Sequence, residues 1–177
     1  TASVYQITKE NVTTDDPNDA GSFKVQTGEA RSRGIELSGK FSFLDNWDAS
    51  LAYAFTDTKI TKDNDGNEGN ELLSSPQTTA SVWINYAFDH GTFDGLSVGT
   101  GVRYTGAYYA TNSNDYEIDA FTLVDMGLRY RVNENVALGV NATNLFDKEY
   151  ISNCAVASKY CYAGDGRRIV ANLTYNW

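Results

Sequence analysis

The residues best suited to chemistry are Cys154 and Cys161, the only two cysteines of the chain. They could form a disulfide, remain free thiols or bind a metal ion. A zinc site is disfavoured, because two sulfur ligands without a neighbouring histidine leave the tetrahedral shell incomplete. The choice between a bridge and free thiols depends on the compartment of the protein, which must be inferred from the rest of the sequence.

Enzymatic sites are not visible in the sequence. The only histidine, His90, falls in a short turn, and no nucleophile and base pair accompanies it. The acidic run 63–68 has its glycine at the fourth position, whereas an EF-hand loop needs one at the sixth, so a solvated acidic loop is the simpler interpretation. The glycines at 99 and 101 lie in a strand pattern with no helix after it, which excludes a nucleotide loop. We therefore expect no enzymatic activity, no metal site and no cofactor.

The composition narrows the class of protein. The formal net charge is −9, which disfavours a nucleic-acid partner, because neutralising phosphates takes lysine and arginine. The mean hydropathy is −0.42, and no apolar run approaches the ~18 residues of a membrane helix. Tyrosine, phenylalanine and glycine are frequent, at 12, 8 and 15 residues. This combination is compatible with a transmembrane β-barrel, whose strands are only half hydrophobic.

Strict alternation of apolar and polar residues predicts eight strands. In the last one, Leu173, Tyr175 and Trp177 share a face, and Asn172, Thr174 and Asn176 share the other. The expected strands are residues 2–9, 35–43, 47–55, 80–88, 96–104, 122–130, 136–143 and 167–177.

Two features favour a barrel over a soluble β-sandwich. Aromatic residues gather at strand ends, as rings do at the two interfaces of a membrane. The connections also alternate in length: short turns at 44–46, 90–95 and 133–135, and long polar links at 12–30, 58–77, 106–120 and 150–166. Short periplasmic turns and long external loops are the rule in outer-membrane barrels.

The prediction is thus an all-β chain, a transmembrane antiparallel up-and-down barrel in the bacterial outer membrane with its C-terminus in the periplasm. No signal peptide precedes the first strand, so we expect the chain to be processed, truncated or both. In an exported chain, an even number of cysteines favours a Cys154–Cys161 disulfide.

Several motifs resemble TonB-dependent outer-membrane receptors. The clearest is NATNLFDKEY at 141–150, which is similar to their penultimate-strand motif. Three weaker motifs precede it in the chain, in the same order as in the family: RSRGIEL at 31–37, SPQTTAS at 75–81 and GVRYTG at 101–106. The paired cysteines of the last long loop, followed by an aromatic residue and a glycine, resemble the ferrichrome or hydroxamate siderophore branch.

This resemblance implies a barrel of about 22 strands with a plug in its lumen. Residues 1–177 would be its last eight strands, without the plug or the segment that contacts the TonB system. The implied ligand is a ferric siderophore of hydroxamate type. By resemblance, Tyr162 is the first candidate for a residue that lines the ligand pocket, and Tyr160 is the second. Tyr108 and Tyr109, in another loop, are further candidates. The terminal Trp177, with Tyr175 and Leu173, resembles the signal read by the barrel-assembly machinery. The expected surroundings are outer-membrane lipid and lipopolysaccharide.

Two alternatives and one ambiguity remain at this point. The chain could be a self-contained eight-stranded barrel with a structural or adhesive role, although its small polar-face residues would underfill so narrow a lumen. An outer-membrane lipid hydrolase would need a histidine at the outer rim, whereas His90 falls in a turn predicted to be periplasmic. Trp83 is predicted to point into the lumen, where it could pack against a plug or against other strands.

Overall fold

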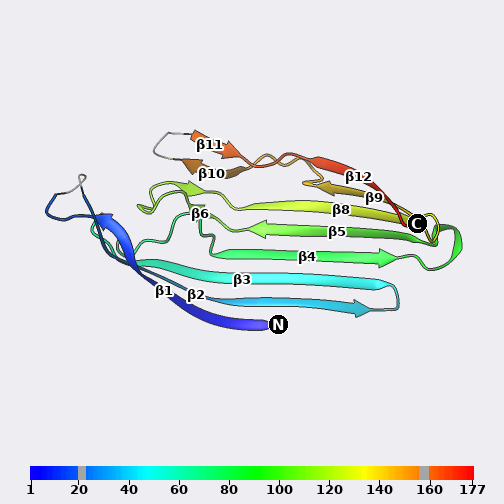
Figure 1. The fold of residues 1–177 in the computed structure, drawn as a ribbon, viewed down its shortest axis with the longest axis horizontal. Coiled ribbons are helices and arrows are strands. Elements are labelled where there is room, and N and C mark those ends of the chain that lie inside the picture. The colour runs from blue at the N-terminus through cyan, green and yellow to red at the C-terminus, as the bar shows by residue number, and fades with distance from the viewer. Residues whose placement is uncertain (20–22, 156–159) are drawn as a thin grey trace.

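The computed structural model describes residues 1–19, 23–155 and 160–177. Its main element is an antiparallel sheet of eight strands that neighbour one another in chain order (Figure 1). These strands are β1 (Ala2–Asp15), β2 (Lys24–Phe43), β3 (Trp47–Lys62), β4 (Thr78–Ala87), β5 (Leu96–Thr105), β8 (Phe121–Arg131), β9 (Val136–Thr143) and β12 (Arg168–Tyr175). The described residues include no helix long and apolar enough to cross a membrane.

Two small hairpins and one helical turn complete the described chain. The hairpins pair β6 (Tyr108–Tyr109) with β7 (Glu117–Ile118), and β10 (Ile151–Ala155) with β11 (Tyr160–Ala163). They lie together beyond one end of the sheet (Figure 1), which we call the loop end. The short connections, including the 3₁₀ turn η1 (Gly91–Phe93), lie at the other end, which we call the turn end.

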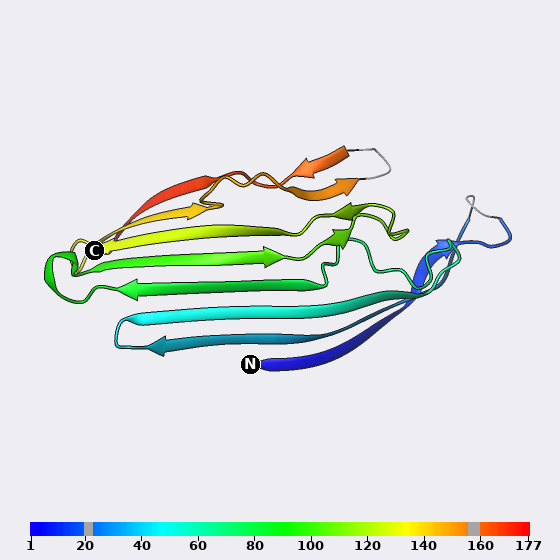
Figure 2. The ribbon, with the colours of Figure 1, turned by 180° about the vertical axis from the view of Figure 1, so that it is seen from behind.

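The sheet is open. Its strand order begins with β1 and ends with β12, and these two strands do not pair with each other in the described part of the chain. Seen from behind, β1 and β12 form the two opposite edges (Figure 2). A self-contained eight-stranded barrel would join these edges, so the structure does not support that alternative.

The register keeps apolar residues together on one face of the sheet. Ile35 pairs with Phe55 and Leu37 with Tyr53, and the same alternation continues through the other strands. We call this the apolar face; although its large side chains are hydrophobic, they are exposed, among them Ile35, Leu37, Tyr53, Phe55, Val82, Ile84, Val102, Tyr104, Leu128, Tyr130, Leu138, Val140, Ile169 and Leu173. The opposite, polar face carries mainly serine, glycine, alanine, asparagine and threonine.

Aromatic rings line the apolar face at the turn end. Trp47 contacts Phe43 and Tyr86 at ring-centroid distances of 6.2 and 4.8 Å, and Phe88 contacts Tyr86 and Phe93 at 4.7 and 5.6 Å. The predicted gathering of aromatic residues at strand ends is therefore confirmed at this end. Such a row of amphipathic rings suits a membrane interface.

Three strands are longer than the sequence pattern predicted. The link expected at 12–30 is mostly strand, since β1 continues to Asp15 and β2 begins at Lys24, and β3 continues to Lys62. Most of their added residues are polar, with isolated apolar ones such as Val12, Val25 and Ile60. Hydrophobic alternation therefore could not reveal these segments, but the backbone ladder continues through them. The sheet thus projects beyond its apolar belt at the loop end.

Candidate functional site

The buried hydrophobic cluster of the described chain lies at the loop end. It consists of Tyr108, Ala110, Ile118 and Cys154, with Phe121 packed against it. These residues come from both small hairpins and from the start of β8. The cluster therefore fixes the β6–β7 and β10–β11 hairpins to each other and to the end of the sheet.

The predicted disulfide between Cys154 and Cys161 is present. The two cysteines are directly paired across β10 and β11, so the bridge closes this hairpin against fraying. In the chain-entropy model, a loop of this length gains about 2.5 kcal/mol of stability from such a cross-link. Tyr116, from the other hairpin, places its hydroxyl 3.5 Å from the Cys161 sulfur.

The four predicted ligand tyrosines are brought to this one region, but they differ in exposure. Tyr160 and Tyr162 are 70 % and 58 % exposed and flank Cys161 on the same side of β11, because side chains two apart in a strand share a face. Tyr109 is half-buried. Tyr108 is only 7 % exposed and donates its hydroxyl to the Ser152 carbonyl at 2.5 Å, which leaves its ring little surface for a ligand.

Burial also changes the acidity of Tyr108. Desolvation is the main cause that raises the pKa of its phenol above the ordinary value, since the charged phenolate is disfavoured away from water. The ring therefore stays neutral at physiological pH and acts as a packing and hydrogen-bonding group.

Its neighbour Tyr109 contacts a different loop through its carbonyl, which accepts a hydrogen bond from the Ser74 amide at 2.8 Å.

Asparagine side chains join the loops to one another. Asn114 accepts a hydrogen bond from the Glu71 amide at 2.8 Å and donates to the Glu71 carbonyl at 3.0 Å. Asn112 accepts from the Leu73 amide at 3.1 Å. These bonds connect the β3–β4 loop to the β6–β7 hairpin. Apart from a local richness in asparagine, no sequence pattern indicates them.

Another asparagine, Asn64, connects the β3–β4 loop to the β1–β2 hairpin. The Asn64 amide donates to the hydroxyls of Thr14 and Thr27 and to the Asp15 carbonyl, each at 3.0 Å. Within the acidic run 63–68, Asp63 caps the Asn67 amide at 2.9 Å. Asp63 therefore orders the loop backbone. The described residues contain no cluster of three or more His, Cys, Asp or Glu side chains able to hold a metal ion.

The NLFD motif is a structural turn between β9 and the β10–β11 hairpin. Asn144 is 3 % exposed and its backbone φ is positive, at 50°. Its side chain donates to the carbonyls of Lys148 and Asp165 at 2.9 and 3.0 Å and accepts from the Lys148 amide at 2.8 Å. Asp147, also at positive φ, accepts from the Arg167 amide at 2.6 Å. The motif therefore fixes where the disulfide hairpin leaves and rejoins the sheet.

The polar face is smooth because its aromatic rings lie over glycines. A Cβ added at Gly99 or Gly101 would come within 2.5 or 2.4 Å of the Trp83 ring, so the indole covers these positions of the neighbouring strand. Tyr5 lies over Gly34 in the same way and bonds to the Thr56 hydroxyl at 2.9 Å. Trp83 thus packs against strand β5, one of the two possibilities that the sequence left open.

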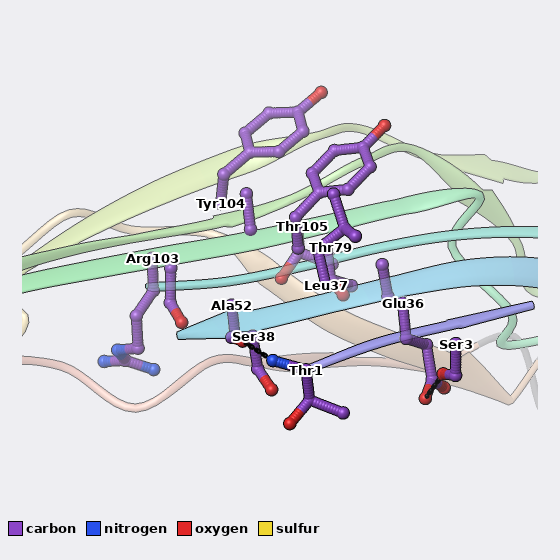
Figure 3. Close-up of a pocket in the computed structure, with 14 residues that line it drawn as sticks. Thr1, Ser3, Glu36, Leu37, Ser38, Ala52, Thr79, Arg103, Tyr104 and Thr105 are labelled. Carbon is purple, nitrogen blue, oxygen red and sulfur yellow. Dashed lines mark hydrogen bonds between the residues drawn. The ribbon is translucent and has the colours of Figure 1, made fainter. Parts of the chain in front are cut away.

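A groove of about 430 Å³ lies mainly on the polar face of β1 to β5. Figure 3 shows Ser3, Glu36, Ser38 and Arg103 on the side of the sheet opposite to Tyr104. Arg103 forms a bidentate ion pair with Asp125, at 2.5 and 3.0 Å. The groove offers hydrogen-bonding groups and small side chains.

Comparison with known proteins agrees with this description. A family model described as "TonB dependent receptor-like, beta-barrel" matches residues 1–145. The chain is 36 % identical, over its whole length, to the ferrichrome outer membrane transporter/phage receptor of Escherichia coli K12, and 31 % identical, over 98 % of its length, to the ferrioxamine B receptor of Salmonella typhimurium. The crystal structure of the siderophore receptor PiuA from Acinetobacter baumannii superposes with a TM-score of 0.84 at 26 % identity, covering 98 % of this chain and 25 % of that one. The chain spans about a quarter of the length of these relatives, 24 % and 25 % for the two receptors.

Proposed function

The chain belongs to the TonB-dependent receptor-like β-barrel family, and from this premise we propose that it forms the last eight strands of an outer-membrane receptor for the uptake of a ferric siderophore. The observation that carries the proposal is the open sheet, with one apolar and one polar face, joined to a disulfide-bridged aromatic hairpin. Transport, rather than chemical conversion of the ligand, is the activity that this arrangement supports.

In this proposal the apolar face contacts lipid and the polar face lines the lumen of a larger barrel. The loop end lies outside the cell, and the turn end and the C-terminus lie in the periplasm. The smooth polar face would hold the plug, which together with the segment that contacts the TonB system belongs to a part of the receptor outside this sequence. The free edges of β1 and β12 would pair with further strands of that receptor.

The last strand would also guide assembly. Leu173, Tyr175 and Trp177 are exposed, and Trp177 is 100 % exposed. Its ring centroid lies 6.4 Å from that of Tyr175. We assign these residues to recognition by the barrel-assembly machinery, since an exposed apolar strand end is available to a partner before the barrel closes. The apolar face would then contact outer-membrane lipid and lipopolysaccharide.

The proposed ligand is a ferric hydroxamate. Support comes from the two relatives described as receptors for ferrichrome and ferrioxamine B, and from the exposed rings of Tyr160 and Tyr162. Aromatic walls suit a ferric siderophore, whose organic shell is large and mostly uncharged. Tyr109 is a further candidate for ligand contact, whereas Tyr108 would act by supporting the hairpin that presents the other tyrosines.

The test is the transport specificity of the intact receptor. A strain that expresses it as its sole siderophore receptor should accumulate radiolabelled iron from ferrichrome or ferrioxamine B, and only when the TonB system is present. A ferric catecholate serves as the control ligand. Uptake that is absent for every ferric siderophore would refute the function, and uptake of the catecholate alone would refute the hydroxamate class.

A further inference from the structure

Two arginines of the polar face are not neutralised by the sheet that carries them. Arg129 and Arg131 lie two residues apart at the end of β8, on the side that also carries Asp125 and Gly127, because alternate residues of a strand share a face. Arg103, on β5, forms a bidentate ion pair with Asp125. None of the ion pairs among the described residues includes Arg129 or Arg131, so two like charges repel at this position.

The neighbours of the two arginines leave both guanidinium groups accessible. Arg129 is opposite Ser97 on one side and Gly139 on the other, and Arg131 is opposite Ala137. Side chains this small cannot cover an arginine, and both arginines are exposed. A partner that approaches the polar face therefore meets these charges directly.

A hollow of about 640 Å³ adjoins both arginines at the turn end. Its lining comes from the ends of β4, β5, β8 and β9 and from the short connections between them. A second hollow, of about 330 Å³, shares Arg129 and Ser97 with the first and extends to Trp83 and Asn141. The arginines thus lie in a recess of the polar face that has room for side chains of another polypeptide.

The acidic residues that line the first hollow have other roles. Asp89 accepts a hydrogen bond from the Asn46 side chain at 2.9 Å and contacts His90 at 2.5 Å. Asp94 and Glu134, in the two connections beside the hollow, form no ion pair with a described arginine or lysine. The charge that complements the arginines must therefore come from outside this sheet.

We propose that Arg129 and Arg131 hold an acidic segment of the plug against the periplasmic end of the barrel wall. The inference rests on the proposed function for the presence of a plug in the lumen. A plug that covers the polar face excludes water from the recess, and a guanidinium group buried there without a partner is strongly unfavourable. Two carboxylates at alternate positions of an extended segment would match the roughly 7 Å between the arginines along β8, and each could form a bidentate pair.

Carbodiimide cross-linking of the full-length receptor in mild detergent identifies the partner, because it joins a lysine amine to a carboxylate in contact with it. In the Arg129→Lys, Arg131→Lys variant, mass spectrometry should find an isopeptide bond between the end of β8 and an aspartate or glutamate of the plug. Arg31→Lys is the matched control. It places a lysine directly opposite Lys59 on the other side of the sheet, where no cross-link to the plug is expected.

Hydrogen exchange measures how firmly the segment is held. Arg129→Gln with Arg131→Gln should raise the opening equilibrium of the cross-linked plug segment about tenfold. Arg31→Gln with Lys59→Gln makes the same change of net charge on the other side of the sheet and should leave this exchange unaltered. Raising NaCl from about 0.1 to about 1 M should speed the exchange in the native receptor but not in the Arg129→Gln, Arg131→Gln variant, a response that a loss of packing alone would not give. Heat-modifiable migration in gels checks that each barrel is folded.

The outcomes separate this inference from the proposed function. Cross-links from the end of β8 only to Asp94 or Glu134, or to no carboxylate, would overturn the inference even where siderophore uptake is normal. Equal exchange of the plug in the native receptor and in the Arg129→Gln, Arg131→Gln variant would also overturn it. A cross-link between β8 and the plug in a receptor that takes up no ferric siderophore would support the inference and refute the proposed function alone.

Discussion

In the sheet, Leu128 and Val140 face each other across β8 and β9 and yet both are exposed, whereas at the loop end Ile118 and Cys154 are buried in a cluster. The sheet is held by its backbone ladders, and in the proposed receptor one face would contact lipid and the other polypeptide. The loop end has its own side-chain core, hydrogen bonds and disulfide. The difference shows that the side chains of the sheet strands need outside partners to become buried, while the loops bury and order their own.

The largest expected effect comes from Asn144, where the two regions join. Asn144→Ala would leave two carbonyls and one amide of a buried turn without partners, so we expect the free energy of unfolding to fall by about 3 kcal/mol. The measurement is urea unfolding of the folded receptor in detergent. Asn85→Ala is the control, since this polar-face side chain makes no hydrogen bond in the described part of the chain, and equal losses in the two variants would contradict the structural role of the motif.

The packing of the sheet can be broken at its glycines. Gly99→Ala should cost about 1–3 kcal/mol, because the new methyl group would overlap the Trp83 ring. Removing the ring should remove the conflict, so Gly99→Ala should be nearly neutral in a Trp83→Ala background. A double-mutant cycle by urea unfolding measures this coupling, and strictly additive losses would show that Trp83 does not cover Gly99.

Removing the disulfide should affect only the loop end. Cys154→Ser with Cys161→Ser is expected to loosen β10 and β11 by up to about 2.5 kcal/mol, with no change in the sheet strands β2 to β5. Hydrogen exchange resolved by peptide separates the two regions. Faster exchange throughout the sheet would show that the loop end is not an independent unit.

Breaking the connection between the β3–β4 loop and the β6–β7 hairpin should have a smaller effect on stability. Asn114→Ala breaks the paired hydrogen bonds to Glu71, which should cost about 1–2 kcal/mol locally. We expect faster exchange of the amides in both the β3–β4 loop and the β6–β7 hairpin. Protection lost in the hairpin alone would mean that the two loops are not coupled.

The smallest expected effect is a pH dependence at the β6–β7 hairpin. Hydrogen bonds from the hydroxyls of Thr111 and Ser113, in that order of importance, lower the pKa of Asp115. Because the pKa of Asp115 is lower in the folded hairpin, its carboxylate stabilises the hairpin fully at pH values above the ordinary carboxyl pKa. This stabilisation is lost as the pH falls through the pKa that Asp115 has in the folded state. Exchange in this hairpin should therefore be constant from about pH 5 to 8 and increase only below about pH 4. Asp115→Asn should abolish that increase, and a pH dependence that persists in the variant would assign it elsewhere.

Much of the sheet could be predicted from the sequence, and much of the loop end could not. Alternation located all eight sheet strands because each keeps its large apolar side chains on one face. It missed the extensions to Asp15, Lys24 and Lys62, where most residues are polar and the apolar ones are isolated. The disulfide followed from export and an even cysteine count. In contrast, nothing in the sequence distinguishes buried Tyr108 from its more accessible neighbour Tyr109, because adjacent residues of a strand point to opposite sides and the side that becomes buried depends on a distant hairpin. The structural role of Asn144 was likewise hidden, since one of its partners, the Asp165 carbonyl, is 21 residues away in the sequence.

In the proposed receptor, the self-ordered loop end presents an aromatic surface for a ferric hydroxamate, while the sheet serves as its scaffold in the membrane. The most direct measurement is the Kd of ferrichrome and ferrioxamine B for the intact receptor, by tryptophan fluorescence quenching. Replacing both Tyr160 and Tyr162 with alanine should weaken binding about tenfold, while Tyr104→Ala, on the apolar face, should leave it unchanged. An unaltered Kd in a folded Tyr160→Ala, Tyr162→Ala receptor would contradict the claim.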